Sequence, residues 1–207
     1  MKFLNSCLAV LMVLCGALEL NAKTIVVPRD HRTIQTAVKA ASPGDTIIVE
    51  DGVYHQSVNI NKSHLIIKAK NPRKAVLDGK RSKPYGFFAE KGRKIVKVVI
   101  QGFEIRNFKS AGVHARYGGG DQYESWIIKD NYIHHAVDKG VVVGGSGHTI
   151  HNNEIAFIGN DGEAAGVHSW SNGSTISDNI IYVIRKNGIR VSSSSKNQVK
   201  NNLIAYT

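Results

Sequence analysis

The sequence predicts an all-β rod of stacked coils, and two repeated phrases with a common period indicate this fold. The first phrase has an aliphatic residue at each end, and its five copies begin at Ile100, Ile128, Ile150, Ile176 and Val199. Successive copies begin 28, 22, 26 and 23 residues apart. A phrase that recurs about every 20–30 residues is typical of chains that fold into stacked coils, in which each coil contacts only its neighbours.

The second phrase starts with a glycine followed by an aliphatic or aromatic residue. Its glycines keep the same period, with steps of 26, 28, 26 and 22 residues, at Gly86, Gly112, Gly140, Gly166 and Gly188. Each coil therefore contains at least three short strands joined by turns. If successive coils keep register, equivalent strands pair in parallel about 4.8 Å apart.

The region before the repeats predicts a cap and a first set of strands. Residues 24–27 form a β-branched run that stops at Pro28, which indicates a strand. Residues 34–41 have apolar side chains at helical spacing, with Thr33 as N-cap and Pro43-Gly44 as the stop. Such an amphipathic helix covers the open end of a β rod. Further strands are expected at residues 46–49, 53–54, 58–60, 65–67 and 75–77.

Each copy of the first phrase contains a pair of residues that marks a bend. The pairs are Gly102-Phe103, Asp130-Asn131, Asn152-Asn153, Asp178-Asn179 and Asn201-Asn202. Asparagine tolerates the left-handed backbone of a sharp corner, and stacked asparagines can form a ladder of amide hydrogen bonds. We therefore expect these asparagines to hold the scaffold together and not to take part in chemistry.

The I-x-N-N-x-I phrases and the Gly-Val or Gly-Ile strands resemble the repeats of the pectate-lyase-like right-handed parallel β-helices. The opening segment, residues 24–54, is similar to the N-terminal cap and first coil of that superfamily. The likeness extends from Lys23 to Thr207 and implies a right-handed, single-stranded parallel β-helix with an N-terminal amphipathic capping helix. In enzymes of this superfamily, the Gly strand and the loop entering it line the substrate groove. The repeats themselves mark scaffold and not activity.

The first 22 residues have the features of a secretory signal peptide. Lys2 gives a charged start, residues 8–18 are apolar, and Ala22 is a small residue at the end of a cleavage site. The β-helix domain is then residues 23–207, secreted or periplasmic, with no membrane span. Both cysteines, Cys7 and Cys15, fall in the leader. Because no cap follows the fifth phrase, we expect the last coil to be truncated or covered by further C-terminal coils or a partner domain.

The chain is strongly basic, with a net charge of +11 and a pI of about 9.7. For an exported protein this balance favours polyanionic partners, above all an acidic polysaccharide. No nucleic-acid-binding motif is present, so nucleic acid is not an expected partner. The alternative is that surface lysines only maintain solubility.

Alternation along the second phrase separates an inner face from an outer face. Val113, Val141, Val167 and Ile189 are expected inside, with Ala115, Val143, Ser169 and Val191. One outward row is Phe88, His114, Val142, His168 and Arg190; the next is Glu90, Arg116, Gly144, Trp170 and Ser192. His114 and His168 are two coils, or roughly 9.6 Å, apart, which is too far for one metal ion.

This outer face contains the groups that β-elimination from a uronic acid requires. The carboxylate must be neutralised and a base must remove the neighbouring proton. His168 is the candidate base, with Arg190 and Lys139 as neutralising cations. Trp170 is a platform for a sugar ring, and further substrate contacts are expected from His114, Arg116 and Lys186. Asp161 and Glu163 are candidate oxygen ligands for Ca²⁺.

The sequence supports three hypotheses of function. The first is a polysaccharide lyase; a uronate C5 epimerase would use the same groups, but the short phrase that alginate epimerases of this fold carry is missing. The second is a non-catalytic rod that binds glycan or joins a cell-surface assembly. The third, a helper in metal maturation, needs clustered soft ligands, and the mature chain has no cysteine or methionine.

Overall fold

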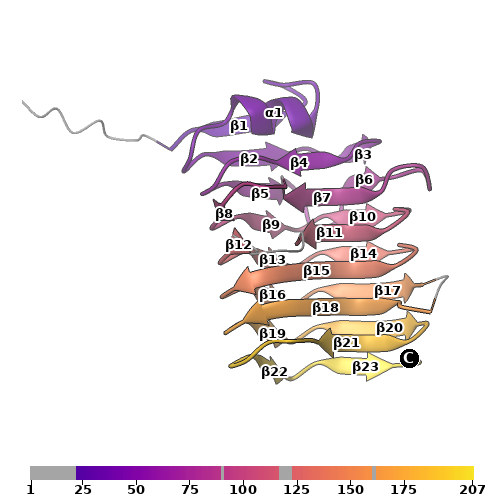
Figure 1. The fold of residues 1–207 in the computed structure, drawn as a ribbon. Helices are drawn as coiled ribbons and strands as arrows, with labels where there is room; N and C mark the ends of the chain where they lie inside the picture. Colours follow the sequence, from indigo (N-terminus) through magenta and orange to yellow (C-terminus); the bar gives the residue numbers. More distant parts are fainter. Residues whose placement is uncertain (1–21, 90, 117–122, 160–161) are drawn as a thin grey trace, which may run out of the picture.

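The chain winds into a column of stacked coils, as the period of its repeats predicts. The computed structural model describes residues 22–89, 91–116, 123–159 and 162–207. Within these ranges three parallel sheets run side by side along the column (Figure 1). Most coils contribute one strand to each sheet, and the seven strands of sheet B correspond to about seven coils in the described residues. Except for Ala22, the leader expected at residues 1–22 lies outside the described residues.

The three sheets take their strands in chain order. Sheet A contains β1 (Thr24–Val27), β2 (Thr46–Val49), β5 (Ile66–Ala69), β9 (Val99–Gln101), β13 (Ile127–Lys129), β16 (Thr149–His151), β19 (Thr175–Ser177) and β22 (Gln198–Lys200). Sheet B contains β3 (Gly52–Tyr54), β6 (Ala75–Asp78), β10 (Glu104–Arg106), β14 (Tyr132–His134), β17 (Glu154–Ile158), β20 (Ile180–Ile184) and β23 (Leu203–Ala205). Sheet C contains β4 (Val58–Ile60), β7 (Tyr85–Ala89), β11 (Ala111–Ala115), β15 (Lys139–Ser146), β18 (Ala165–Asn172) and β21 (Asn187–Val191), extended by β8 (Ile95–Val96) and β12 (Tyr123–Glu124). The early strands thus lie within one or two residues of their predicted positions.

The predicted cap is a short helix, α1 (Ile34–Ala40), at the start of the column. The Thr33 hydroxyl accepts a hydrogen bond from the backbone N–H of Thr36, which confirms Thr33 as the N-cap. The helix buries Ile34, Ala37 and Val38 against the core. In the described ranges no helix has the length and apolar character needed to cross a membrane.

The corner between sheets A and B is built as the bend pairs predict. The first residue of each pair has a positive φ, from 51° at Asn152 to 80° at Gly102. The second residue is buried in most coils and forms an amide ladder. For example, the Asn153 side chain accepts a hydrogen bond from the backbone N–H of Asn131 at 3.1 Å and donates to the carbonyl of Ile128 at 2.8 Å. Equivalent bonds join Asn179 to Asn153 and Asn202 to Asn179. The ladder satisfies polar groups that a buried corner would otherwise leave unpaired.

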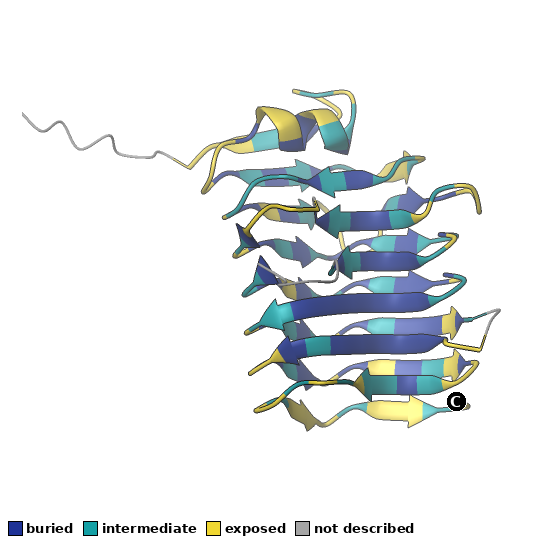
Figure 2. Cartoon of the chain, viewed as in Figure 1, coloured by how far each residue is buried: buried dark blue, intermediate teal, exposed yellow. Residues whose placement is uncertain are grey.

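Apolar side chains fill the inside of the column, and the inward rows predicted for sheet C are mostly confirmed. The middle strands of sheet C are largely buried (Figure 2), and Val113, Val141 and Val167 are fully buried. The glycine of the second phrase is needed because a Cβ on Gly140 would lie 2.5 Å from the carbonyl oxygen of Gly166. The prediction for Val191 is wrong, since this residue is 42% exposed. Val191 lies on β21, the edge strand of sheet C, which has a neighbour on one side only.

Candidate functional site

On the outer face of sheet C, His114, His168, Arg190 and Trp170 lie in the predicted register. Cα pairing aligns His114 with Val142, Val142 with His168, and His168 with Arg190. Trp170 pairs with Gly144 in the neighbouring row. His114 and His168 are therefore two coils apart and belong to one outward row. Glu90 of the second row lies outside the described residues.

His168 points outward but is covered, which corrects the prediction that its imidazole is displayed at the surface. Only 2% of the residue is exposed. The indole of Trp170 stacks on the imidazole, with 3.3 Å between the ring centroids. Nε2 lies 3.1 Å from the Ser192 hydroxyl, whereas Nδ1 has no hydrogen-bond partner among the described residues. The side chain is thus a buried imidazole with one nitrogen unsatisfied.

Arg116 completes the cover over His168. Its guanidinium carbon lies 3.9 Å from the centre of the Trp170 indole. An imidazole and a guanidinium cannot both lie this close on one face, so the indole is held between them. Arg116 directly follows β11, two coils before β18, and the residue that pairs with Trp170 on the intervening strand is Gly144. Because glycine has no side chain, the Arg116 side chain can cross the intervening coil.

The cations predicted to neutralise a substrate carboxylate are already engaged with acids of the protein. Arg190 and Lys186 each bond one oxygen of Glu163, the latter at 3.0 Å. These two hydrogen bonds, with Lys186 first, lower the pKa of Glu163 to about 2. Lys139 is buried, and its ammonium pairs with Asp138. Arg190 and Lys139 are therefore available to a substrate only if its carboxylate replaces or joins these partners.

The calcium site stays a prediction. Asp161 lies outside the described residues, and both oxygens of Glu163 already accept from cations. In the part of the chain that the structure describes, no group of three or more His, Cys, Asp or Glu side chains is placed to hold a metal ion.

The electrostatic setting keeps His168 neutral. Burial lowers its pKa to about 3, and the positive charges of Arg190, Lys139 and Arg116 act in the same direction. His114 lies farther along the row, where its ring contacts Tyr85 in a tilted arrangement, with 4.4 Å between the ring centroids, and burial lowers its pKa to about 4. The structure thus brings His168, Trp170, Arg116 and the cations into one cluster.

A second polar network, on sheet B, has residues that the sequence analysis did not single out. Glu154 accepts from the Tyr182 hydroxyl at 2.8 Å and from Arg73 at 2.6 Å. Two coils earlier, Glu104 lies 2.7 Å from Arg106 and 3.3 Å from Nε2 of His134. The register of the repeats could have pointed to this network, because Glu104, Tyr132 and Glu154 occupy equivalent positions of successive strands.

Comparison with known families identifies the scaffold. The family model described as "Right handed beta helix region" matches residues 80–207. No curated protein matches the sequence.

Solved structures share the fold but differ in activity. The alginate lyase of Paenibacillus sp. FPU-7 superposes with a TM-score of 0.60 and 16% identity, over 88% of this chain and 76% of the lyase. A putative glycosyl hydrolase of Parabacteroides merdae has a TM-score of 0.60 and 15% identity, over 83% and 86%. Pectin methylesterase PemA of Erwinia chrysanthemi has a TM-score of 0.55 and 14% identity, over 79% of this chain and 55% of the enzyme. At these identities the likeness is one of fold, so activity must be argued from the site.

Proposed function

The chain belongs to the right-handed β-helix family, and on that scaffold we propose that it acts on an acidic polysaccharide as a lyase, by β-elimination at a uronic acid. The substrate site is the outer face of sheet C around His168. We propose a secreted or periplasmic location, consistent with the leader expected at residues 1–22 and with the net charge of +11. The named activities of the solved structures support action on carbohydrate, and the substrate class rests on the charges of this chain.

The observation that carries the proposal is the state of His168. Its Nε2 faces a hydroxyl and its Nδ1 faces no partner among the described residues, which fits a neutral ring with the proton on Nε2. A neutral imidazole with a free lone pair is the form that accepts a proton. The cations that help to lower its pKa, Arg190 foremost, are also the groups that would bind a substrate carboxylate.

In the proposed reaction, a uronate carboxylate binds at Arg190 and Lys139. Neutralising that carboxylate acidifies the proton on the carbon beside it, and Nδ1 of His168 takes this proton. The electron pair left on carbon forms a double bond to the next ring carbon, whose bond to the glycosidic oxygen breaks. The departing oxygen then takes up a proton. Bound carboxylate also offsets the cations and so raises the pKa of His168 toward that of an effective base.

The test is the ultraviolet absorbance of the unsaturated product. The full chain is incubated with pectate, alginate and glycosaminoglycans, each with and without calcium. We expect absorbance to rise with one of these polymers. No rise with any of them contradicts the lyase proposal. A changed ratio of uronate epimers without a rise in absorbance would indicate C5 epimerisation.

A second candidate is a rod that binds acidic glycan without turnover, alone or in a surface assembly. The closed stack of Arg116, Trp170 and His168 favours it, because a buried imidazole with a pKa near 3 is a weak base. If the protein is such a rod, we expect it to be retained on an immobilised acidic glycan without forming product. We also expect the His168→Ala, Arg190→Ala double variant to be retained nearly as well as the parent, whereas a lyase would lose turnover in that variant.

A further inference from the structure

The corner where sheet B leads into sheet C has an unusual choice of residues. From β10 onward, each sheet B strand has one residue at this corner that directly follows the strand or, in β17 and β20, is the next-to-last residue of the strand, which the pairing skips. All of them have a positive φ, between 51° and 60°, and they are Asn107, His135, Phe157, Val183 and Tyr206.

Asn107 and His135 are of residue types that adopt this backbone more often than most, whereas for a bulky or β-branched residue such as Val183 it is a genuine outlier. At the corner between sheets A and B, the five bend pairs meet the same requirement with glycine, aspartate and asparagine, and Arg73, between β5 and β6, also has a φ of 60°. Residues in sparsely populated backbone regions cluster at functional sites, so Phe157, Val183 and Tyr206 single out the corner between sheets B and C as a candidate site.

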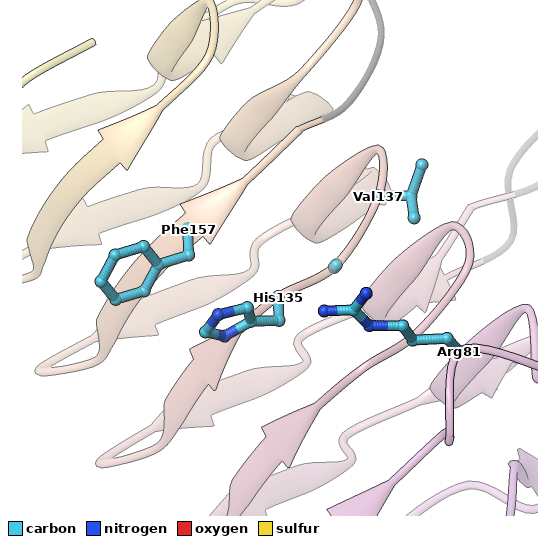
Figure 3. Close-up of a pocket in the computed structure, with 5 residues that line it drawn as sticks. Arg81, His135, Val137 and Phe157 are labelled. Carbon is cyan, nitrogen blue, oxygen red and sulfur yellow. The ribbon is translucent and has the colours of Figure 1, made fainter.

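These side chains border two adjoining hollows at the corner. Both are lined by His135 and Phe157. The first hollow is also lined by Arg81 and Val137. Figure 3 shows the Arg81 guanidinium directed toward the His135 ring. The second has a volume of about 480 Å³, within the range of roughly 300–1,000 Å³ that ligand pockets occupy. We call the two hollows together the corner groove.

The corner groove combines an apolar wall with a cation. Phe157 is 42% exposed and Val183 is 43% exposed. Arg81 is exposed, and within the described ranges its guanidinium has no carboxylate partner. His135 is the outer member of a hydrogen-bonded chain, since its Nδ1 lies 2.6 Å from His134 and His134 reaches Glu104. A ligand that has both a negative charge and a ring with an apolar face would pair its charge with Arg81 and His135 and pack its ring against Phe157.

We propose that the corner groove binds a uronate residue of an acidic glycan, with its carboxylate on Arg81 and its ring against Phe157. The inference rests on the proposed function for the ligand class only. Gly159, which directly follows β17, lines the groove, and the next strand along the chain, β18, carries His168. The corner groove is a glycan subsite that adds affinity, and the reaction takes place elsewhere.

The test is calorimetric titration of the full chain with the tetrasaccharides of galacturonate and mannuronate, with maltotetraose as the neutral control. Arg81→Gln removes the charge, and Phe157→Asn removes the ring while installing a residue that tolerates the backbone. We expect at least one acidic tetrasaccharide to bind, each variant to weaken it at least fivefold, and maltotetraose not to bind. The midpoint of thermal unfolding should stay the same or rise for Phe157→Asn, since the backbone strain is relieved.

The results separate this proposal from the proposed function. If Arg81→Gln and Phe157→Asn bind as the parent does while Arg190→Gln binds weakly, the corner groove is overturned and the site on sheet C stands. If the parent binds neither acidic tetrasaccharide, the corner groove is overturned, and the absorbance assay, which also includes glycosaminoglycans, decides the lyase proposal separately. Equal binding of maltotetraose overturns the role given to Arg81.

Discussion

The imidazole of His168 lies against the indole of Trp170, with 27° between the ring planes. The two residues are separated by one position on β18 and therefore point to the same side of the sheet. Because Arg116 holds the other face of the indole, Trp170 has no face free for a sugar ring in this arrangement. Access to His168 requires the stack to open.

Replacing the cover should change the titration of His168. Burial is the largest cause of its low pKa. We therefore expect Trp170→Ala to raise that pKa from about 3 toward its ordinary value of 6.5, measured from the imidazole proton shifts by NMR. Arg190→Gln should raise it by a smaller amount. If Trp170→Ala leaves the pKa near 3 while Arg190→Gln raises it, the neighbouring charges and not burial govern His168.

Removing the proposed base should abolish turnover and leave glycan binding. His168→Gln keeps a side chain of similar size that can still bond Ser192. General base catalysis contributes about 10²–10⁴-fold, so we expect turnover on the responsive polymer to fall by at least ~100-fold with a similar KM. His55→Gln, which alters an exposed histidine in the loop before β4, is the matched control. Turnover of His168→Gln equal to that of the control would exclude His168 as the base.

Substitutions in the asparagine ladder should lower the free energy of unfolding more than substitutions at other corners. Asn153→Ala removes the acceptor of two buried donors, the backbone N–H and the side-chain amide of Asn131. Each such group costs about 1–3 kcal/mol, so the free energy of unfolding should fall by roughly 2–5 kcal/mol in urea denaturation. Asn202→Ala, at the half-buried end of the ladder, should cost less. If the two variants lose equal amounts of the free energy of unfolding, burial does not determine how much the ladder stabilises the protein.

Much of the scaffold was predictable because its rules are local and repeat in every coil. Asn153 and its equivalents occupy a bend that needs a left-handed residue followed by a buried amide, and both requirements are visible in the sequence. Register follows from the same period, which is why His168 and Arg190 were placed side by side correctly.

The covered state of the site was not predictable, because it depends on which way long side chains turn. The indole of Trp170 bends over His168, and Arg116 reaches it across two coils. The sequence contained a hint in Gly144, whose missing side chain leaves the path open. The corner groove was missed for a different reason. Phe157 and Val183 favour strands by propensity, and only stacking forces them into a left-handed corner.

His148 should make the column sensitive to mild acid. Its Nδ1 accepts the backbone N–H of Trp126 at 3.2 Å, and its Nε2 donates to the Gly144 carbonyl at 2.8 Å. Only the neutral ring can do both, because a protonated Nδ1 cannot accept. Burial, the largest cause, lowers the pKa of His148 from 6.5 to about 4.

Between these two values the unfolded chain binds a proton at His148 that the folded chain does not bind. The stability contributed by the neutral ring is therefore fully present above pH 6.5 and is lost as the pH falls toward 4. The slope attributable to one such group is at most about 1.4 kcal/mol per pH unit. His148→Gln removes the titrating ring and keeps an amide that can both accept and donate. We expect urea denaturation at a series of pH values to show a shallower loss of stability for this variant between pH 6.5 and 4. Slopes that match those of the parent would assign the acid sensitivity to His114 and His168, whose pKa values are lowered in the same direction.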